Sequence, residues 1–332
     1  MITQTRIILD QERIFSIRAG FFCINSSAQL LQRAALMAVA LLLGACASAP
    51  PKNIPDPTLP PAPVVETVKK PLKVGLALGG GAARGFAHVG VIAVLEEAGL
   101  KPQIVVGTSA GSLVAALYAS GKTSAQLQQT ALTMEEVTIT DWMLPIIGKG
   151  VFRGDALGRY VNQLVGGRLI ENMAMPLGIV ATDLNSGQAM LFQRGDTGTA
   201  VRASSAVPAV FVPVKISGRE YVDGGLVSPV PVRFARQMGA DIVIAVDISS
   251  PPEANPATDT LQILLQTFAI MGKSINQYEL KDADVVVRPA LAGLKSADFS
   301  ARQRAIDSGR AAMLAALPAL KAKLAAGVAM AQ

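Results

Sequence analysis

A serine at the centre of a G-x-S-x-G pattern, Ser109 between Gly107 and Gly111, is the first candidate for chemistry in this sequence. Small flanking residues allow the sharp strand-to-helix turn that projects a nucleophilic hydroxyl above the edge of a sheet. An apolar stretch precedes the pattern and a helical stretch follows it, which is the context that such a turn requires. The pattern alone is also consistent with a tight structural turn that carries a small polar residue.

A serine nucleophile needs a base, and few residues can supply it. The 332 residues contain one histidine, His88, which precedes the serine instead of following it as in the usual hydrolase order. Because His88 lies among apolar residues, we interpret it as a half-buried structural side chain. A carboxylate could accept the proton directly, and Asp223 is the best candidate because Gly224 and Gly225 follow it. The same D-G-G sequence could equally form an Asp-Gly hairpin turn.

A glycine-rich loop lies between the first expected strand and the first expected helix. Its backbone N–H groups would form an anion site before a helix N-terminus. A dinucleotide site would require an acidic residue at the end of the second strand, which instead runs into Gly107 and Ser109. We therefore expect an oxyanion hole for a tetrahedral intermediate, with Arg84 bracing the loop. The loop residues concerned are Gly80, Gly81, Ala82, Ala83, Arg84 and Gly85.

Together these three motifs resemble the patatin-like phospholipase family, and its bacterial branch in particular. The loop continues as R-G-x-x-H-x-G at residues 84–90, and further similar stretches occur at 181–184 and 201–208. The resemblance covers residues 73–290. It implies a three-layer α/β/α fold and hydrolysis of lipid acyl esters by a Ser-Asp dyad, without a metal ion or another cofactor.

The resemblance also implies roles for individual residues. Ser109 would be the nucleophile and Asp223 the base. The backbone of Gly80, Gly81 and Ala82 would form the oxyanion loop. Ala82 departs from the family pattern, in which many members have a glycine. Its N–H group is still available, so we expect the oxyanion hole to survive if alanine tolerates the backbone conformation.

The motifs lie among alternating strands and helices. Short apolar runs predict strands at residues 73–78, 103–106, 177–183, 188–193, 210–216, 219–222, 241–247 and 283–288. Helical patterns occur at 86–98, 112–120, 123–136, 154–165, 230–238, 258–280 and 299–325, and we expect the alanine-rich C-terminus to lie on the surface. Strands buried on both faces and alternating with helices predict an α/β fold with a mostly parallel central sheet.

Composition excludes several classes of protein. Hydrophobic residues make up 51% of the chain, but the longest apolar run, residues 34–47, is shorter than the roughly 18 residues of a membrane-spanning helix. This excludes a polytopic membrane protein. Two cysteines and one histidine exclude a disulfide scaffold and a histidine-rich metal site. The net charge of +6 includes no Lys/Arg-rich stripe, so we expect no nucleic-acid partner.

The N-terminal region has the features of an export signal. Residues 34–45 form a short apolar segment, and the sequence LGAC that ends at Cys46 resembles a bacterial lipobox. We expect residues 1–45 to be a signal peptide with an N-terminal extension, and a lipid on Cys46 to tether the protein to a membrane. Because Ala47 follows the cysteine, the resemblance implies the outer membrane, facing the periplasm. An ordinary signal peptide with an incidental cysteine is the alternative.

The rest of the chain divides into three parts. Residues 46–72 comprise the cysteine and an extended linker with eight prolines. Residues 73–290 would form the hydrolase domain and residues 291–332 a C-terminal helical segment. Residues 137–153 contain the only tryptophan and are interpreted either as a lid or membrane-facing loop or as packed core.

The sequence as a whole predicts a membrane-tethered serine acyl hydrolase that acts on a phospholipid or another acyl ester. Ser109 would attack the ester carbonyl, Asp223 would accept the proton, and water would release the acyl-enzyme. Two alternatives stay open. One is a catalytically vestigial scaffold of the same fold, and the other is a protein that binds a nucleotide or acyl phosphate in the glycine loop.

Overall fold

The computed structural model describes residues 72–135, 152–252, 257–294 and 299–330. The predicted signal peptide, Cys46 and the linker up to residue 71 lie outside the described residues, as does most of the predicted lid. None of the helices in the described ranges is both long enough and apolar enough to cross a membrane.

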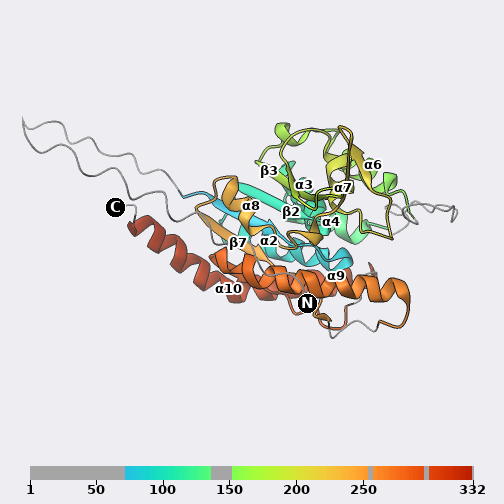
Figure 1. Ribbon diagram of the computed structural model, residues 1–332. Coiled ribbons are helices and arrows are strands. Elements are labelled where there is room, and N and C mark those ends of the chain that lie inside the picture. The colour runs from blue at the N-terminus through green and yellow to red at the C-terminus, as the bar shows by residue number, and fades with distance from the viewer. Residues whose placement is uncertain (1–71, 136–151, 253–256, 295–298, 331–332) are drawn as a thin grey trace, which may run out of the picture. The chain divides into compact units, whose positions relative to one another are not determined.

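An eight-stranded sheet organises the described residues (Figure 1). Its strand order is β5-β6-β3-β2-β1-β7-β8, with β4 paired to β3. The strands are β1 (Val74–Leu78), β2 (Ile104–Thr108), β3 (Leu177–Asp183), β4 (Ala189–Phe192), β5 (Val214–Ile216), β6 (Arg219–Asp223), β7 (Ile242–Val246) and β8 (Val285–Val287). Strands β3, β2, β1, β7 and β8 are parallel, whereas β4, β5 and β6 pair in antiparallel fashion. The prediction of a mostly parallel sheet is confirmed.

Helices cover both faces of this sheet, which confirms the three-layer arrangement (Figure 1). The helices are α2 (Ala87–Glu97), α3 (Ala110–Ala119), α4 (Ser124–Thr133), α6 (Asp155–Leu164), α7 (Thr197–Ser204), α8 (Val232–Gln237), α9 (Thr260–Glu279) and α10 (Arg302–Met330). Successive side chains of β1 point to opposite faces: Leu76 and Leu78 pack with α2, α3 and α10, and Ala77 packs with α8. Burial of both faces explains why the strands read as continuous apolar runs.

Two elements differ from the sequence-based expectations. Helix α7 was not predicted from the sequence, because its threonine, glycine and serine residues have low helix propensity. Asp196 begins this helix by accepting a hydrogen bond from the N–H group of Thr199 at 2.7 Å. The strand predicted at residues 210–216 begins only at Val214, directly after Pro213, which has no N–H group to donate to a sheet.

The C-terminal helix α10 packs tightly on α2 instead of lying only on the surface. Ile306 and Met313 of α10 are buried in the same core as α2. A Cβ atom at Gly90 of α2 would lie 2.0 Å from the carbonyl oxygen of Ile306, so glycine is required for this close approach. Helix α10 therefore helps to position α2 and the glycine-rich loop that precedes it.

Candidate active site

Ser109 occupies the sharp turn between β2 and α3. Its backbone angles are φ 53° and ψ −124°, a conformation that non-glycine residues rarely adopt. Two hydrogen bonds hold the turn: the N–H group of Ser109 donates to Ser204 Oγ at 2.8 Å, and Ser112 Oγ donates to the Ser109 carbonyl oxygen at 2.6 Å. The turn brings the Ser109 side chain into the wall of a cavity.

The glycines that flank Ser109 and Asp223 permit close contact between backbone segments. A Cβ atom at Gly111 would lie 2.1 Å from the carbonyl oxygen of Leu78, and one at Gly107 would lie 2.3 Å from the carbonyl oxygen of Gly111. Gly224 has a similar restriction, with the Val180 carbonyl oxygen 2.2 Å from its Cβ position. The end of β1 therefore lies directly against the first turn of α3.

The substitution Gly111→Ala is expected to lower the free energy of unfolding by about 3 kcal/mol or to prevent folding, because the overpacked backbone must move. Chemical denaturation followed by circular dichroism measures this change. Gly272→Ala in α9 is the matched control, since its new Cβ would meet no atom closer than Pro229 Cγ at 3.5 Å, and alanine favours a helix interior. Equal unfolding transitions for Gly111→Ala and the wild type would exclude the close contact between Gly111 and the carbonyl oxygen of Leu78.

Asp223 ends β6 and lies beside Ser109. Its Oδ1 accepts a hydrogen bond from the N–H group of Gly225 at 2.7 Å. The carboxyl group is buried, and burial raises its pKa to about 6, while hydrogen bonds from the Ser109 hydroxyl and the Gly225 N–H group act in the opposite direction. The structure thus brings together the serine and the carboxylate that the sequence singled out.

The Asp-Gly hairpin considered for this position does not form. Strand β6 pairs with β5 and β3, both of which precede it in the chain. After Asp223 the chain enters a short 3₁₀ helix, Gly224–Leu226, and continues to α8. The glycine pair instead turns the chain sharply away from the sheet and leaves the carboxyl group at the strand end.

The glycine-rich loop between β1 and a 3₁₀ helix, η1 (Ala82–Phe86), touches the turn at Ser109. A Cβ atom at Gly80 would lie 3.1 Å from Ser109 Cβ. The N–H group of Gly80 donates to the Pro229 carbonyl oxygen at 2.9 Å, and that of Arg84 donates to the Gly81 carbonyl oxygen at 3.2 Å. These two N–H groups are therefore removed from the expected set of oxyanion donors. In the part of the chain that the structure describes, those of Gly81, Ala82 and Ala83 have no acceptor.

Ala82 adopts the backbone conformation that a glycine would adopt without strain. Its φ is 50°, in the left-handed region that disfavours residues with a Cβ atom. An alanine tolerates this region at a cost of about 1–2 kcal/mol. The departure from the glycine of the family pattern therefore leaves the N–H group available and adds a methyl group to the cavity wall.

Two buried side chains donate hydrogen bonds to carbonyl oxygens of the glycine-rich loop. Arg84 Nε donates to the Gly81 carbonyl oxygen at 3.3 Å, and although burial lowers its pKa to about 10, the guanidinium is still charged at neutral pH. His88 is fully buried, not half-buried, and its Nε2 donates to the Gly79 carbonyl oxygen at 2.8 Å. Burial lowers the pKa of His88 to about 4, so the ring is neutral. Both side chains therefore stabilise the loop, and His88 has the structural role that was predicted for it.

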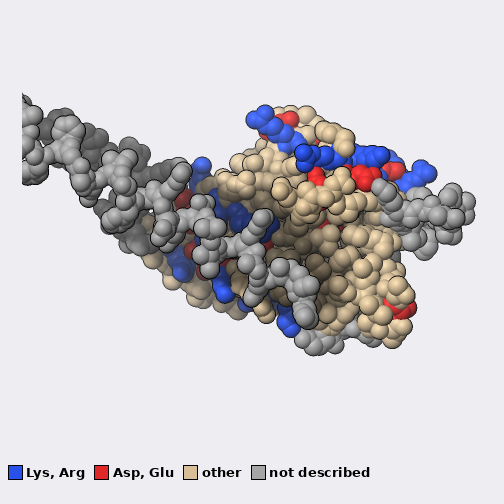
Figure 2. Space-filling model, viewed as in Figure 1, with Lys and Arg blue, Asp and Glu red and all other residues tan. Residues whose placement is uncertain are grey.

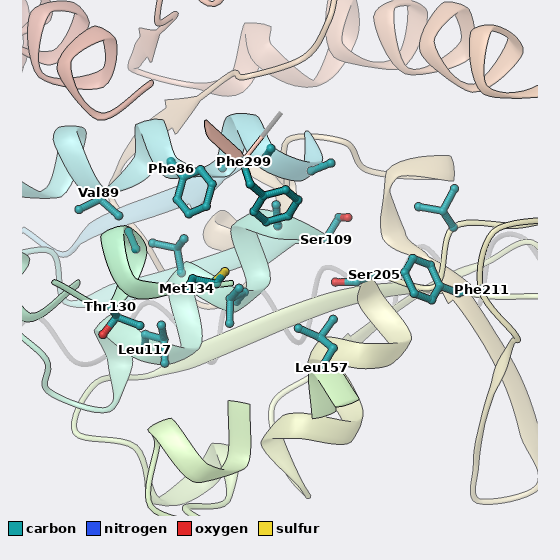
Figure 3. A pocket seen from close by; sticks show the side chains of 18 of the residues that line it. Phe86, Val89, Ser109, Leu117, Thr130, Met134, Leu157, Ser205, Phe211 and Phe299 are labelled. Carbon is teal, nitrogen blue, oxygen red and sulfur yellow. The ribbon is translucent and has the colours of Figure 1, made fainter. Parts of the chain in front are cut away.

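Ser109 lines a cavity of about 790 Å³ whose walls are almost entirely apolar (Figure 3). The walls come from η1, α2, α3, α4, α6 and α9, together with Met134, Phe152, Phe299 and the segment from Ser205 to Phe211. Figure 3 shows Ser109 near Ser205 at one side, with Leu117 and Thr130 farther along the cavity. Within the described ranges, no group of three or more His, Cys, Asp or Glu side chains could hold a metal ion.

Sequence reasoning missed the contribution of two neighbouring serines. Ser204 Oγ accepts the hydrogen bond from the Ser109 N–H group and donates to the Val180 carbonyl oxygen at 2.5 Å. Ser205 lines the cavity, and Figure 3 shows its hydroxyl facing the same space as that of Ser109. Both lie in the 201–208 stretch that resembles the patatin-like family, but this signal assigns no role to either residue.

A comparison with known families agrees with this geometry. Residues 76–236, which include Ser109, Asp223 and the glycine-rich loop, match the family model of the patatin-like phospholipases. This part of the chain is therefore similar to the patatin-like phospholipases. The helices α9 and α10 follow the matched part of this patatin-like chain.

The patatin-like chain has relatives in bacteria and mammals. It is 38% identical over 188 residues to an uncharacterized NTE family protein of Mycobacterium tuberculosis, covering 56% of this chain and 52% of the relative. It is 32% identical over 231 residues to patatin-like phospholipase domain-containing protein 6 of Homo sapiens, covering 67% of this chain and 16% of the relative. The chain therefore spans about half the length of the first relative and a smaller part of the second.

The fold of the patatin-like domain also occurs in a solved structure. VipD from Legionella pneumophila superimposes with a TM-score of 0.52 and 15% identity, covering 75% of this chain and 67% of that chain. At this low identity the likeness concerns the fold alone. It agrees with the three-layer arrangement around the central sheet.

Proposed function

We propose that this chain is a serine acyl hydrolase that cleaves carboxylic ester bonds of lipids, with Ser109 as the nucleophile and Asp223 as the base. The similarity to the patatin-like phospholipases supports activity on lipid esters. One observation carries the proposal: the Ser109 hydroxyl interacts with a buried carboxyl group beside a large apolar cavity. A hydroxyl placed in this way can lose its proton to the carboxylate as it attacks an ester.

The first half-reaction forms the acyl-enzyme. Ser109 Oγ attacks the carbonyl carbon while Asp223 accepts the hydroxyl proton. The N–H groups of Gly81 and Ala82 stabilise the negative charge on the carbonyl oxygen, and removing one such donor typically costs about 3 kcal/mol of transition-state stabilisation. Asp223 then gives the proton to the leaving alcohol, the carbon–oxygen bond breaks, and the acyl group stays on Ser109.

The second half-reaction uses water in place of the alcohol. Asp223 removes a proton from a water molecule, and the resulting hydroxide attacks the carbonyl carbon of the acyl-enzyme. The same backbone N–H groups stabilise the second oxyanion. Collapse of this intermediate releases the carboxylic acid, and the proton returns from Asp223 to Ser109 Oγ.

The cavity fits the acyl chain of a substrate better than a polar group. The hydroxyls in its wall belong to Ser109, Ser205 and Thr130, and Thr130 already donates to the Gln126 carbonyl oxygen at 2.9 Å. Each methylene group buried against such walls stabilises binding by about 0.8 kcal/mol. A nucleotide or acyl phosphate would need polar or charged walls, so the cavity disfavours that alternative.

The rate at low substrate concentration is expected to follow the ionisation of Asp223. Because its pKa is raised to about 6, the carboxylate that accepts the proton is lost as the pH falls below this value. The value of kcat/KM should fall about tenfold per pH unit below about pH 6 and reach a plateau above it. Initial rates on a water-soluble ester across this range measure the effect. A flat profile between about pH 5 and 7 would argue against Asp223 as the base.

Release of fatty acids from defined lipids tests the proposed function. Wild-type and Ser109→Ala proteins are incubated with phospholipids, lysophospholipids and neutral acylglycerols, and free fatty acids are quantified by mass spectrometry. We expect release from at least one lipid class by the wild type and none above background by the variant. A folded wild type that releases no acid from any class would favour a catalytically vestigial scaffold.

We also propose that the protein is exported and anchored through a lipid on Cys46, at the outer membrane facing the periplasm. The support is the apolar segment at residues 34–45 directly before the cysteine. Mass spectrometry of the membrane fraction should detect Cys46 as a lipid-modified N-terminal residue. An unmodified Cys46 inside a longer peptide would exclude this anchor.

A further inference from the structure

Helix α9 presents large apolar side chains to solvent. Ten large hydrophobic residues are exposed in the described ranges, and six of them lie on α9: Leu261, Ile263, Leu265, Ile270, Met271 and Tyr278. None of residues 260–271 is buried, although their sequence is TLQILLQTFAIM. The exposed side chains of the first three turns of α9 therefore lack the tertiary packing that an apolar helix normally gives them.

The same part of α9 carries no charge. Residues 260–272 include no Lys, Arg, Asp or Glu, and no acidic residue occurs between Asp259 and Glu279. Figure 2 shows the surface over α9, on the right of the view, as largely uncharged. Such a surface can enter the boundary between lipid head groups and acyl chains without burying a charge. It also lacks the carboxylates that anionic head groups would repel.

Helix α9 also contributes to the cavity that contains Ser109. Leu265 lines this cavity, and 39% of its surface is exposed, so one side chain belongs both to the cavity wall and to the exposed apolar surface. A lipid that leaves a bilayer at α9 would therefore meet apolar surface along its way toward Ser109. This continuity favours a lipid surface over other occupants of the exposed face.

We propose that residues 260–271 of α9 insert into the surface of a phospholipid bilayer and that lipid esters enter the cavity past Leu265. The helix lies in the interface with its apolar side chains among the acyl chains, and it does not span the membrane. The insertion is independent of catalysis, whereas the entry route rests on the proposed function. This contact is separate from the lipid proposed for Cys46, because it is made by the folded domain itself.

Quenching by nitroxide-labelled lipids at a single position tests the insertion. Full-length protein with Cys23→Ser and Cys46→Ser receives one new cysteine, Ile263→Cys, which carries an environment-sensitive fluorophore. With vesicles of phosphatidylcholine and phosphatidylglycerol, we expect emission at shorter wavelength and about twofold or stronger quenching by nitroxides on the acyl chains. Leu314→Cys on α10 is the matched control, since Leu314 is 52% exposed and Ile263 55% exposed, and it should not be quenched.

Two results would overturn the insertion. The first is the absence of quenching at Ile263→Cys, or equal quenching at both labelled positions. The second is a shift in emission that appears without vesicles and grows with protein concentration, because it would assign the exposed face of α9 to a second copy of the chain. Both readouts are independent of hydrolysis, so they decide the insertion even if the proposed function fails.

A paired substitution tests the route of the lipid. Ile263→Glu with Ile270→Glu adds two carboxylates at exposed positions outside the cavity, so hydrolysis of a water-soluble short-chain ester should not change. Hydrolysis of vesicle lipids should fall by about tenfold or more, because charged side chains disfavour insertion. Equal losses on both substrates, or no loss on vesicles, would overturn entry past Leu265. A wild type that hydrolyses neither substrate would instead contradict the proposed function.

Discussion

The Ser109→Ala protein is expected to hydrolyse lipid esters at least about 10⁴-fold more slowly than the wild type while keeping its fold. The substitution removes the oxygen that forms the bond to the acyl group. It leaves intact the hydrogen bond from the residue 109 N–H group to Ser204 Oγ, which holds the turn. Initial rates on the lipid class that the wild type cleaves give the activity, and circular dichroism gives the fold.

A serine at the opposite end of α3 provides the control for this loss. Ser120 follows α3 at its C-terminal end, and its Oγ donates only to the Leu117 carbonyl oxygen at 2.7 Å. Ser120→Ala should change the rate by less than about twofold, because Ser120 does not line the cavity that contains Ser109. Rates of Ser109→Ala close to those of the wild type would exclude Ser109 as the nucleophile.

Asp223→Asn is expected to lower kcat by about 10⁴-fold or more, a loss comparable to that on removal of the carboxylate from a serine triad. Asparagine can still accept the hydrogen bond that the Gly225 N–H group donates to Asp223 Oδ1 at 2.7 Å. It cannot accept the proton of the Ser109 hydroxyl. Geometry is thus retained while basicity is lost, and single-turnover rates on a soluble ester measure the consequence for acylation.

Stability changes in the opposite direction from activity in this variant. Burial raises the pKa of Asp223 from 3.8 to about 6, so folding favours the protonated carboxyl group. The contribution of this group to the free energy of unfolding is fully present below about pH 4 and is lost as the pH rises through 6. At higher pH the buried carboxylate lowers stability by up to about 3 kcal/mol, which the neutral asparagine does not. The free energy of unfolding of Asp223→Asn near pH 8 should therefore equal or exceed that of the wild type. A large loss of stability would identify Asp223 as a structural carboxylate.

Asp183 is a matched aspartate at the end of the neighbouring strand β3. Its Oδ1 accepts hydrogen bonds from the N–H groups of Asn185 and Ser186, and its Oδ2 pairs with Arg219 at 3.1 Å. Hydrogen bonding to Ser186 and the other groups lowers its pKa, so its contribution to stability is present above the unfolded pKa. Asp183→Asn should therefore be less stable near pH 8 but still active. An inactive, fully stable Asp183→Asn would contradict the choice of Asp223 as the base.

Local patterns were sufficient to predict the parts of the site that depend on short stretches of chain. The turn at Ser109 follows from an apolar strand, small residues and a helix in direct succession. The position of Asp223 follows from a short strand that ends in a glycine pair. That the two segments meet does not follow from these patterns, because β6 runs antiparallel to β3. Asp223 reaches the level of Ser109 only through the register in which it pairs with Ala181 while Thr108 pairs with Val180.

Features that depend on distant contacts were not predictable in the same way. The N–H group of Gly80 is occupied because the Pro229 carbonyl oxygen, far along the chain, lies opposite it. Ser204 supports the turn at Ser109 only because α7 forms, and the residues of α7 have low helix propensity. The cavity likewise combines side chains from several helices, each of which reads in sequence as an ordinary core helix.

Covalent labelling of the serine tests the central claim most directly. A fluorophosphonate reacts with an activated serine hydroxyl and leaves a stable adduct, which mass spectrometry can assign to one residue. We expect the adduct on Ser109 of the folded wild type, with labelling abolished in Ser109→Ala and strongly reduced in Asp223→Asn. An adduct on a different serine, or an unlabelled Ser109 in folded wild-type protein, would contradict a Ser109–Asp223 dyad.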